Sequence, residues 1–156
     1  MEDLMTGMEP VEEVQYIVVK LGNEQYGIDI SYVDNIVRMQ RITRVPKSQH
    51  YYVGVINLRG EIVPIMSLRK RFGLADDEYT GATRIIIIRS EDQSMVGFIV
   101  DEVQEVVNLD PRKIEKPAFK LDEENASFLA GIGKKADESL ISLLDIWAVL
   151  EEKQEV

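Results

Sequence analysis

The most constraining feature of the sequence is the stretch GVINLRGEIVPIMSLRKRFG, from Gly54 to Gly73. Its two apolar runs are separated only by Arg59 and Gly60. This spacing predicts a β-hairpin, because glycine readily adopts the positive φ that tight hairpin turns require. Arg59, with its five hydrogen-bond donors, would lie at the exposed tip. From this stretch alone, an ordinary solvated turn residue is the simpler interpretation of Arg59.

Other strand patterns lie on both sides of this hairpin. Runs rich in β-branched and other apolar residues, bounded by turn signals, predict six further strands. These cover residues 15–21, 26–30, 85–88, 95–100, 128–132 and 140–144. The isoleucines at 85–88 form an unbroken apolar run, which is typical of a strand covered on both faces.

Three short helices are predicted between and after these strands. Apolar residues from Ile30 to Val37 recur at spacings of three and four, which fits about two turns of amphipathic helix. The segment 68–72 fits one helical turn that ends at Gly73. Asp145 is a suitable N-cap for a last helix in which Trp147 would be the main packing anchor. The valines of segment 100–107 repeat the helical spacing but are also compatible with a strand.

The two halves of the chain form a weak internal repeat. YGIDISYVDNIV, from Tyr26, matches VGFIVDEVQEVV, from Val96, at an offset of 70, and IVPIMSL, from Ile62, matches LISLLDI, from Leu140, at an offset of 78. Each half is about the size at which a small β-barrel becomes stable. We therefore expect one domain over residues 14–150, flanked by tails at 1–13 and 151–156. The domain would consist of two intertwined barrel subdomains, roughly 14–82 and 83–150, with a groove between them.

Composition excludes several classes of function. The chain has no cysteine and one histidine, His50, so thiolate and histidine-based metal sites are excluded by count. The net charge of −10 disfavours nucleic acid as a partner, and the basic run at 69–71 fits the solvated end of a helix better than a phosphate site. No signal sequence or long apolar run is present, which predicts a cytoplasmic protein. The carboxylates lie mainly in exposed runs, and the glycines match no phosphate-binding loop, so no enzyme or cofactor is indicated.

Taken together, four motifs carry a family resemblance. They are YGIDI at Tyr26, GVINLRGEIVPIMSL at Gly54, VGFIVDEV at Val96 and GIGKKADESLISLLDI at Gly131. In order and spacing, these motifs resemble those of the CheW family of bacterial chemotaxis coupling proteins. The match covers about residues 14–150. The chain leaves no room for the kinase or receiver domains of CheA and CheV proteins, so a free-standing member fits best.

The resemblance implies a mainly β fold of two SH3-like five-stranded barrels and a non-catalytic adaptor without cofactors or metals. Such an adaptor scaffolds a signalling complex, binding the cytoplasmic tip of methyl-accepting chemoreceptors and the regulatory domain of the kinase CheA, in receptor clusters at the membrane. The receptor-binding residues that the resemblance implies are Val33, Ile36, Gly54, Arg59, Val100, Val103 and Val106. Kinase-binding residues are not assigned, and Asn35 stands where the family often has glutamate.

Two other classes of function compete with the adaptor. A small-barrel nucleic-acid binder would need aromatic residues beside basic ones, for which the sequence offers Tyr51 and Tyr52 near Lys47. A carboxylate hydrolase would need an acidic side chain whose pKa is far above its ordinary value. For each apolar residue of the implied groove, core packing is the competing interpretation, since spacing does not distinguish core from surface.

Overall fold

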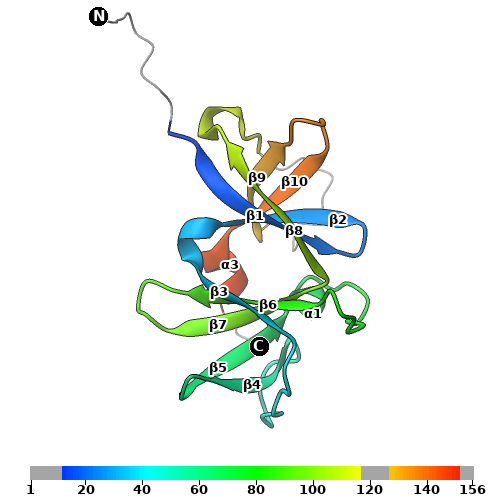
Figure 1. The fold of residues 1–156 in the computed structure, drawn as a ribbon, viewed down its shortest axis with the longest axis vertical. Helices are drawn as coiled ribbons and strands as arrows, with labels where there is room; N and C mark the ends of the chain where they lie inside the picture. The colour runs from blue at the N-terminus through cyan, green and yellow to red at the C-terminus, as the bar shows by residue number, and fades with distance from the viewer. Residues whose placement is uncertain (1–11, 117–126, 152–156) are drawn as a thin grey trace, which may run out of the picture.

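The computed structural model describes residues 12–116 and 127–151, which form two β-sheets and a few short helical turns (Figure 1). The strands are β1 (Val14–Leu21), β2 (Glu24–Asp29), β3 (Val33–Arg38), β4 (Tyr52–Leu58), β5 (Glu61–Ser67), β6 (Arg84–Arg89), β7 (Met95–Val100), β8 (Glu102–Leu109), β9 (Leu129–Lys134) and β10 (Leu140–Leu144). The helical segments are η1 (Ile30–Tyr32), α1 (Leu68–Arg71), η2 (Pro111–Lys113) and α3 (Ile146–Leu150). The predicted tails fall almost entirely outside the described residues.

Each sheet combines strands from both halves of the chain. Sheet 1 has the order β8-β1-β2-β10-β9 and sheet 2 the order β3-β6-β7-β5-β4. The β1–β2 hairpin therefore joins three strands of the second half, and the β6–β7 hairpin joins three strands of the first. The expected division near residue 82 does not coincide with the boundary between the sheets, because sequence similarity between halves does not reveal this exchange of hairpins.

Each sheet is curled, and one isolated bridge brings its two edges together. After β3 the chain returns to β4, where Thr43 and Val55 exchange backbone hydrogen bonds of 2.9 and 2.8 Å. After β8 the chain returns to β9, where Glu115 and Ile132 exchange backbone hydrogen bonds of 3.0 and 2.7 Å. The predicted pair of five-stranded, SH3-like units is confirmed. Closure by single bridges means that neither sheet is a fully hydrogen-bonded barrel.

The internal repeat corresponds to equivalent strands. The offset of 70 relates β2 to β7, and the offset of 78 relates β5 to β10. In both halves a glycine lies beside the parallel neighbour strand: Gly27 opposite Leu143, and Gly97 opposite Ile65. A Cβ added at Gly97 would lie 2.6 Å from side-chain atoms of both Ile65 and Ile85, so this approach requires glycine.

One large apolar cluster lies between the sheets. It includes Ile17 and Val19 of sheet 1, and Ile86, Ile88 and Phe98 of sheet 2. The helices α1 and α3 add residues to the same cluster, namely Leu68, Ile146 and Val149. Smaller clusters fill the interior of each sheet. The four isoleucines of β6 are all fully buried, two in the shared cluster and two inside sheet 2, which confirms the prediction of a strand covered on both faces.

Two local predictions are wrong. The segment from Ile30 to Val37 is not an amphipathic helix: only η1 is helical, and β3 follows it with alternating burial. Tertiary pairing with β6 overrides the spacing of three and four, which the β-branched residues also allow in a strand. Trp147 is not a packing anchor either, because it is 50% exposed, while Ile146 and Val149 face the core. The helix has only five residues and buries a single face.

Gly97, where β7 pairs in parallel with β5, gives the first test. Gly97→Ala should lower the free energy of unfolding by about 1–3 kcal/mol, because the methyl group would overlap the packed side chains of Ile65 and Ile85. Urea unfolding followed by circular dichroism measures the change. Gly81→Ala is the matched control, since a Cβ added there would meet no other atom within 4 Å. Equal effects of the two substitutions would contradict the close packing at Gly97.

Candidate partner-binding surface

The edge strands β3 and β8 present matching apolar residues. Both lie at sheet edges, and the offset of 70 relates Val33 to Val103 and Ile36 to Val106. Val33 and Val103 are partly buried against the shared core. Ile36 and Val106 are exposed by 38% and 50%. The two strands thus expose equivalent apolar positions on either side of the inter-sheet core.

Each of these edge strands contains a β-bulge at the same place. Asp34 is the extra residue of β3, since Val33 pairs with Ile88 and Asn35 with Ile87. Gln104 is the extra residue of β8, where Val103 and Glu105 pair with consecutive residues of β1. Bulges bend and twist an edge strand, which limits pairing with further strands. A partner is therefore more readily accommodated by side chains than by strand addition.

The acidic residue beside Asn35 does not replace the expected glutamate. Asp34 is engaged by Arg89, whose Nε donates to its carboxylate at 3.2 Å. Asn35 is partly buried, and its amide oxygen accepts a hydrogen bond of 2.8 Å from the backbone N–H of Ile36. At this position the chain therefore presents no free carboxylate to a partner.

The other implied site residues are not all on this surface. Val100 is fully buried in the shared core, so its implied contact role is corrected to packing. Gly54 is also buried, and a Cβ there would lie 2.2 Å from the Thr43 carbonyl oxygen. Gly54 consequently permits the bridge that closes sheet 2, because only glycine leaves room for this approach. Apolar spacing could not separate Val100 from its exposed neighbours, because core and surface residues share the same pattern.

Arg59 lies where the hairpin pattern predicts. It occupies the exposed two-residue turn between β4 and β5, with φ of 53° followed by 85° at Gly60. The side-chain oxygen of Asn57 accepts a hydrogen bond of 3.0 Å from the Gly60 N–H and fixes the turn. Figure 1 shows this hairpin at the end of sheet 2, away from β8. Arg59 and the apolar pair Ile36 and Val106 thus form separate surfaces.

A charged cluster fixes the corner where β8 begins. Arg69, on α1, donates from Nε to Asp101 Oδ1 at 2.9 Å, and the backbone N–H of Gly22 donates to Oδ2 at 2.7 Å. The cluster joins the β1–β2 turn of sheet 1 to α1, the helix that follows β5 of sheet 2. Hydrogen bonding from Arg69 lowers the pKa of Asp101. The prediction that Arg69 solvates a helix end is therefore wrong, because local pattern does not reveal a partner 32 residues away.

The third residue of this basic run is also held in place. Arg71 is buried, and its Nε donates to the Val149 carbonyl oxygen at 2.9 Å. Its guanidinium lies 4.4 Å from the centre of the Tyr51 ring. The run at 69–71 therefore joins α1 to α3 and to the core, with the half-buried Lys70 between the two arginines.

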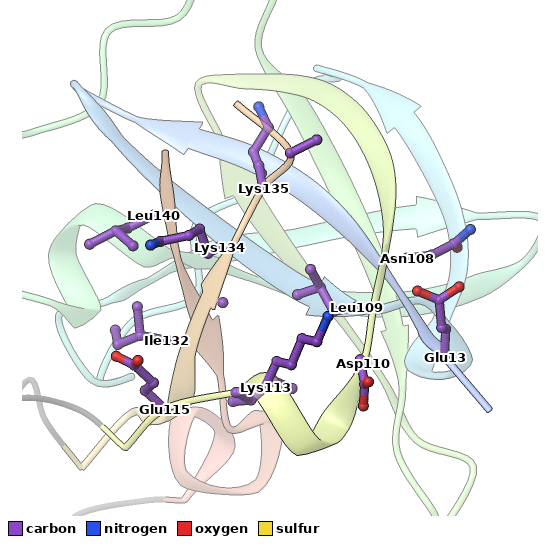
Figure 2. A pocket seen from close by; sticks show the side chains of 13 residues that line it. Glu13, Asn108, Leu109, Asp110, Lys113, Glu115, Ile132, Lys134, Lys135 and Leu140 are labelled. Carbon is purple, nitrogen blue, oxygen red and sulfur yellow. The ribbon is translucent and has the colours of Figure 1, made fainter. Parts of the chain in front are cut away.

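The hollow drawn in Figure 2 is lined by side chains of both charges. It lies between η2 and β9, has a volume of about 630 Å³, and carries Lys113, Lys134 and Lys135 interspersed with Glu13, Asp110 and Glu115. Lys135 forms an ion pair of 2.5 Å with Glu105. Across the described residues, no group of three or more His, Cys, Asp or Glu side chains could hold a metal ion.

Comparison with known proteins agrees with this architecture. The family model "CheW-like domain" matches residues 15–154. The chain belongs to the CheW family. It is 34% identical to a chemotaxis protein CheW of Helicobacter pylori over 140 residues (90% of this chain, 83% of the relative), and 36% identical to that of Bacillus subtilis over 137 residues (88% and 86%). The crystal structure of the scaffolding protein TtCheW from Thermoanaerobacter tengcongensis superimposes with a TM-score of 0.81 at 32% identity, covering 96% of this chain and 95% of the other.

The likeness extends to a protein that is much longer than this CheW-family chain. The chemotaxis protein CheV3 of Helicobacter pylori is 24% identical over 128 residues, which represent 81% of this chain but 41% of CheV3. None of the helices that the structure describes combines the length and apolarity needed to span a lipid bilayer.

The Asp101 cluster predicts a pH-dependent contribution to stability. Because Asp101 has a lowered pKa in the folded protein, its ionised form stabilises the fold above the ordinary aspartate pKa of about 3.9. This contribution is lost as the pH falls through the folded-state pKa. Asp101→Asn should lower the free energy of unfolding by about 1 kcal/mol at pH 7, since solvent screens this partly exposed pair. Urea unfolding at pH 7 and in strong acid should show the gap between wild type and variant shrinking in acid. A gap that persists unchanged in acid would contradict the ionic role of Asp101.

Proposed function

We propose that this chain, a chemotaxis adaptor that couples chemoreceptors to the histidine kinase CheA, binds the receptor through the apolar side chains of β3 and β8. The ligand of this surface is the cytoplasmic tip of a methyl-accepting chemotaxis protein. The second partner is the regulatory domain of CheA. The adaptor is non-catalytic and is recruited from the cytoplasm to receptor clusters at the membrane.

The observation that carries this proposal is the equivalence of Ile36 and Val106. The repeat duplicates one exposed apolar position on two edge strands, and both strands pack on the same core. An amphipathic helix docks through the apolar side chains of one face, so exposed apolar positions on both edge strands suit a helix as the partner. Val33 and Val103 form the partly buried floor beside them.

Arg59 contributes a second contact of different chemistry. A guanidinium at a rigid turn can donate two parallel hydrogen bonds to one carboxylate. Because the hairpin lies away from β8, Arg59 would act on assembly with the kinase or on coupling, and not on the receptor-binding surface formed by Ile36 and Val106. A nucleic-acid binder is the weaker alternative, since the net charge of −10 repels a phosphate backbone.

The apolar surface gives a direct test of receptor binding. Ile36→Lys or Val106→Lys should weaken binding of a receptor signalling-tip fragment by about tenfold or more, because each buries a charge at an apolar contact. Isothermal titration with the purified fragment measures the affinity. Leu140→Lys, at an exposed apolar position on β10, is the matched control and should bind like wild type. Wild-type affinity in both test variants would overturn this assignment.

Arg59→Glu tests the role of the hairpin tip. The side chain is exposed and the backbone turn is retained, so the thermal midpoint should change little. We expect reduced formation of the ternary complex and reduced activation of CheA autophosphorylation by receptors. Co-sedimentation and a kinase assay measure the two effects. Normal assembly together with normal activation would exclude Arg59 from the coupling surface.

A further inference from the structure

The positive charge of the first half is concentrated in one stretch of the sequence. Between Asp34 and Glu61 no acidic residue occurs, whereas Arg38, Arg41, Arg44, Lys47 and Arg59 are present. These 26 residues carry +5, so the remaining 130 carry −15 in a chain whose net charge is −10. A separation of this size is not expected of a surface whose charges only maintain solubility, where both signs are interspersed.

The cations of this stretch are exposed, and none of them forms an ion pair with another residue that the structure describes. Residues 38–50 connect β3 to β4, and Arg38, Arg41, Arg44 and Lys47 are all exposed. The ion pairs found within residues 12–116 and 127–151 involve other cations, namely Arg69, Arg89, Arg112 and Lys135. Within the described residues this basic segment thus has no carboxylate partner, although acidic residues outnumber basic ones in the sequence.

Three adjoining hollows follow this segment, and no carboxylate is among the described residues that line them. The largest, of about 820 Å³, is lined by Arg44, Lys47, His50 and Lys70 together with neutral residues. The second hollow shares Val45, Lys47 and Tyr52 with the largest one. The third hollow shares Arg44 and Val53 with the largest one and is also lined by Arg41. Because neighbouring hollows share residues, they form one continuous surface, which we call the basic strip. The hollow in Figure 2, beside β9 at the opposite end of the molecule in Figure 1, carries balanced charges instead.

The loop that carries the basic strip is held in a defined shape. At the start of the loop, Thr43 is hydrogen-bonded through its backbone to Val55 of β4. At the end of the loop, the backbone N–H of Tyr52 donates to the Gln49 carbonyl oxygen at 3.0 Å. Between them Lys47 adopts a positive φ of 65°, and the Ser48 hydroxyl donates to the Val45 carbonyl oxygen at 3.0 Å. Val45 is itself 45% exposed. A preorganised loop with cations around an apolar side chain loses little entropy on binding.

We propose that the basic strip docks an acidic polypeptide segment that also carries aliphatic side chains. Carboxylates of the segment would pair with Arg41, Arg44, Lys47 and Lys70, and an aliphatic side chain would cover Val45. Charge complementarity selects acidic partners and accelerates encounter with them. A nucleic acid is less suited, because the surrounding charge of −15 would repel a phosphate backbone extending beyond the strip. The basic strip adds a surface to the proposed adaptor function and does not depend on the receptor contacts.

The experiment uses the full chain and a short fluorescein-labelled peptide of glutamate, leucine and glycine. Fluorescence anisotropy should show binding to wild type that weakens as salt rises towards about 0.15 M, where screening is strong. Arg44→Glu combined with Lys47→Glu should weaken binding by about tenfold, because two ion pairs become repulsive. Lys113→Glu combined with Lys134→Glu removes two exposed cations beside the Figure 2 hollow and is the matched control, expected to bind like wild type. Unchanged thermal midpoints show that both variants fold.

Three outcomes of the peptide experiment would overturn the inference. They are absence of peptide binding by wild type at low salt, equal losses in the two double variants, and tighter binding of a single-stranded oligonucleotide of the same charge. Sedimentation of wild type alone tests a second copy as the occupant. Salt-sensitive self-association that is lost in Arg44→Glu/Lys47→Glu would also overturn the inference, by assigning the strip to that contact. Ile36→Lys should bind the peptide normally, so failure of the receptor-binding proposal remains distinguishable from failure of this one.

Discussion

The apolar cluster between the two sheets positions every other part of the molecule. It takes side chains from both sheets and from α1 and α3, and the chain passes between the sheets twice, from β2 to β3 and from β7 to β8. Neither sheet could separate without exposing fully buried residues such as Phe98 and Leu68, at a cost of about 1.5–3 kcal/mol for each. The positions of β3 and β8 relative to each other are therefore set by core packing.

The exchange of hairpins duplicates features that a single small sheet would provide once. Each half contributes a bulged edge strand, a glycine beside a parallel neighbouring strand, and a short capped helix after its last strand. The helix caps are also equivalent, since Ser67 and Asp145 each accept a hydrogen bond from a backbone N–H three residues later. The halves differ at their second hairpin: the β4–β5 turn has two residues, whereas residues 135–139 link β9 to β10. Arg59 has no counterpart in the longer link.

The surfaces left for partners differ in physical character. Ile36 and Val106 offer apolar area on a rigid support, where affinity depends on shape and water exclusion. The basic strip offers exposed cations, where binding depends on ionic strength and charge complementarity contributes mainly to partner selection and association rate. An adaptor that holds two partners at once benefits from this difference, because a change in one surface leaves the other intact. The strip is difficult to predict from the sequence because its cations are spaced three apart and form no contiguous basic run.

Local turn chemistry and residue pattern were enough to predict the hairpin at Arg59, the buried isoleucines of β6, most strand positions and the repeat. The family came from the resemblance of four sequence motifs to those of known proteins. Turn chemistry and pattern could not predict that the hairpins are exchanged, that Ile30 to Val37 forms mainly a strand, that Trp147 is exposed, or that Val100 is core while Val106 is surface. These features became clear only from the folded chain, because burial depends on which strands pair across long separations. Val100 and Val106 have the same side chain, and it is the packing of strands distant in sequence that assigns one of them to the interior and the other to the surface.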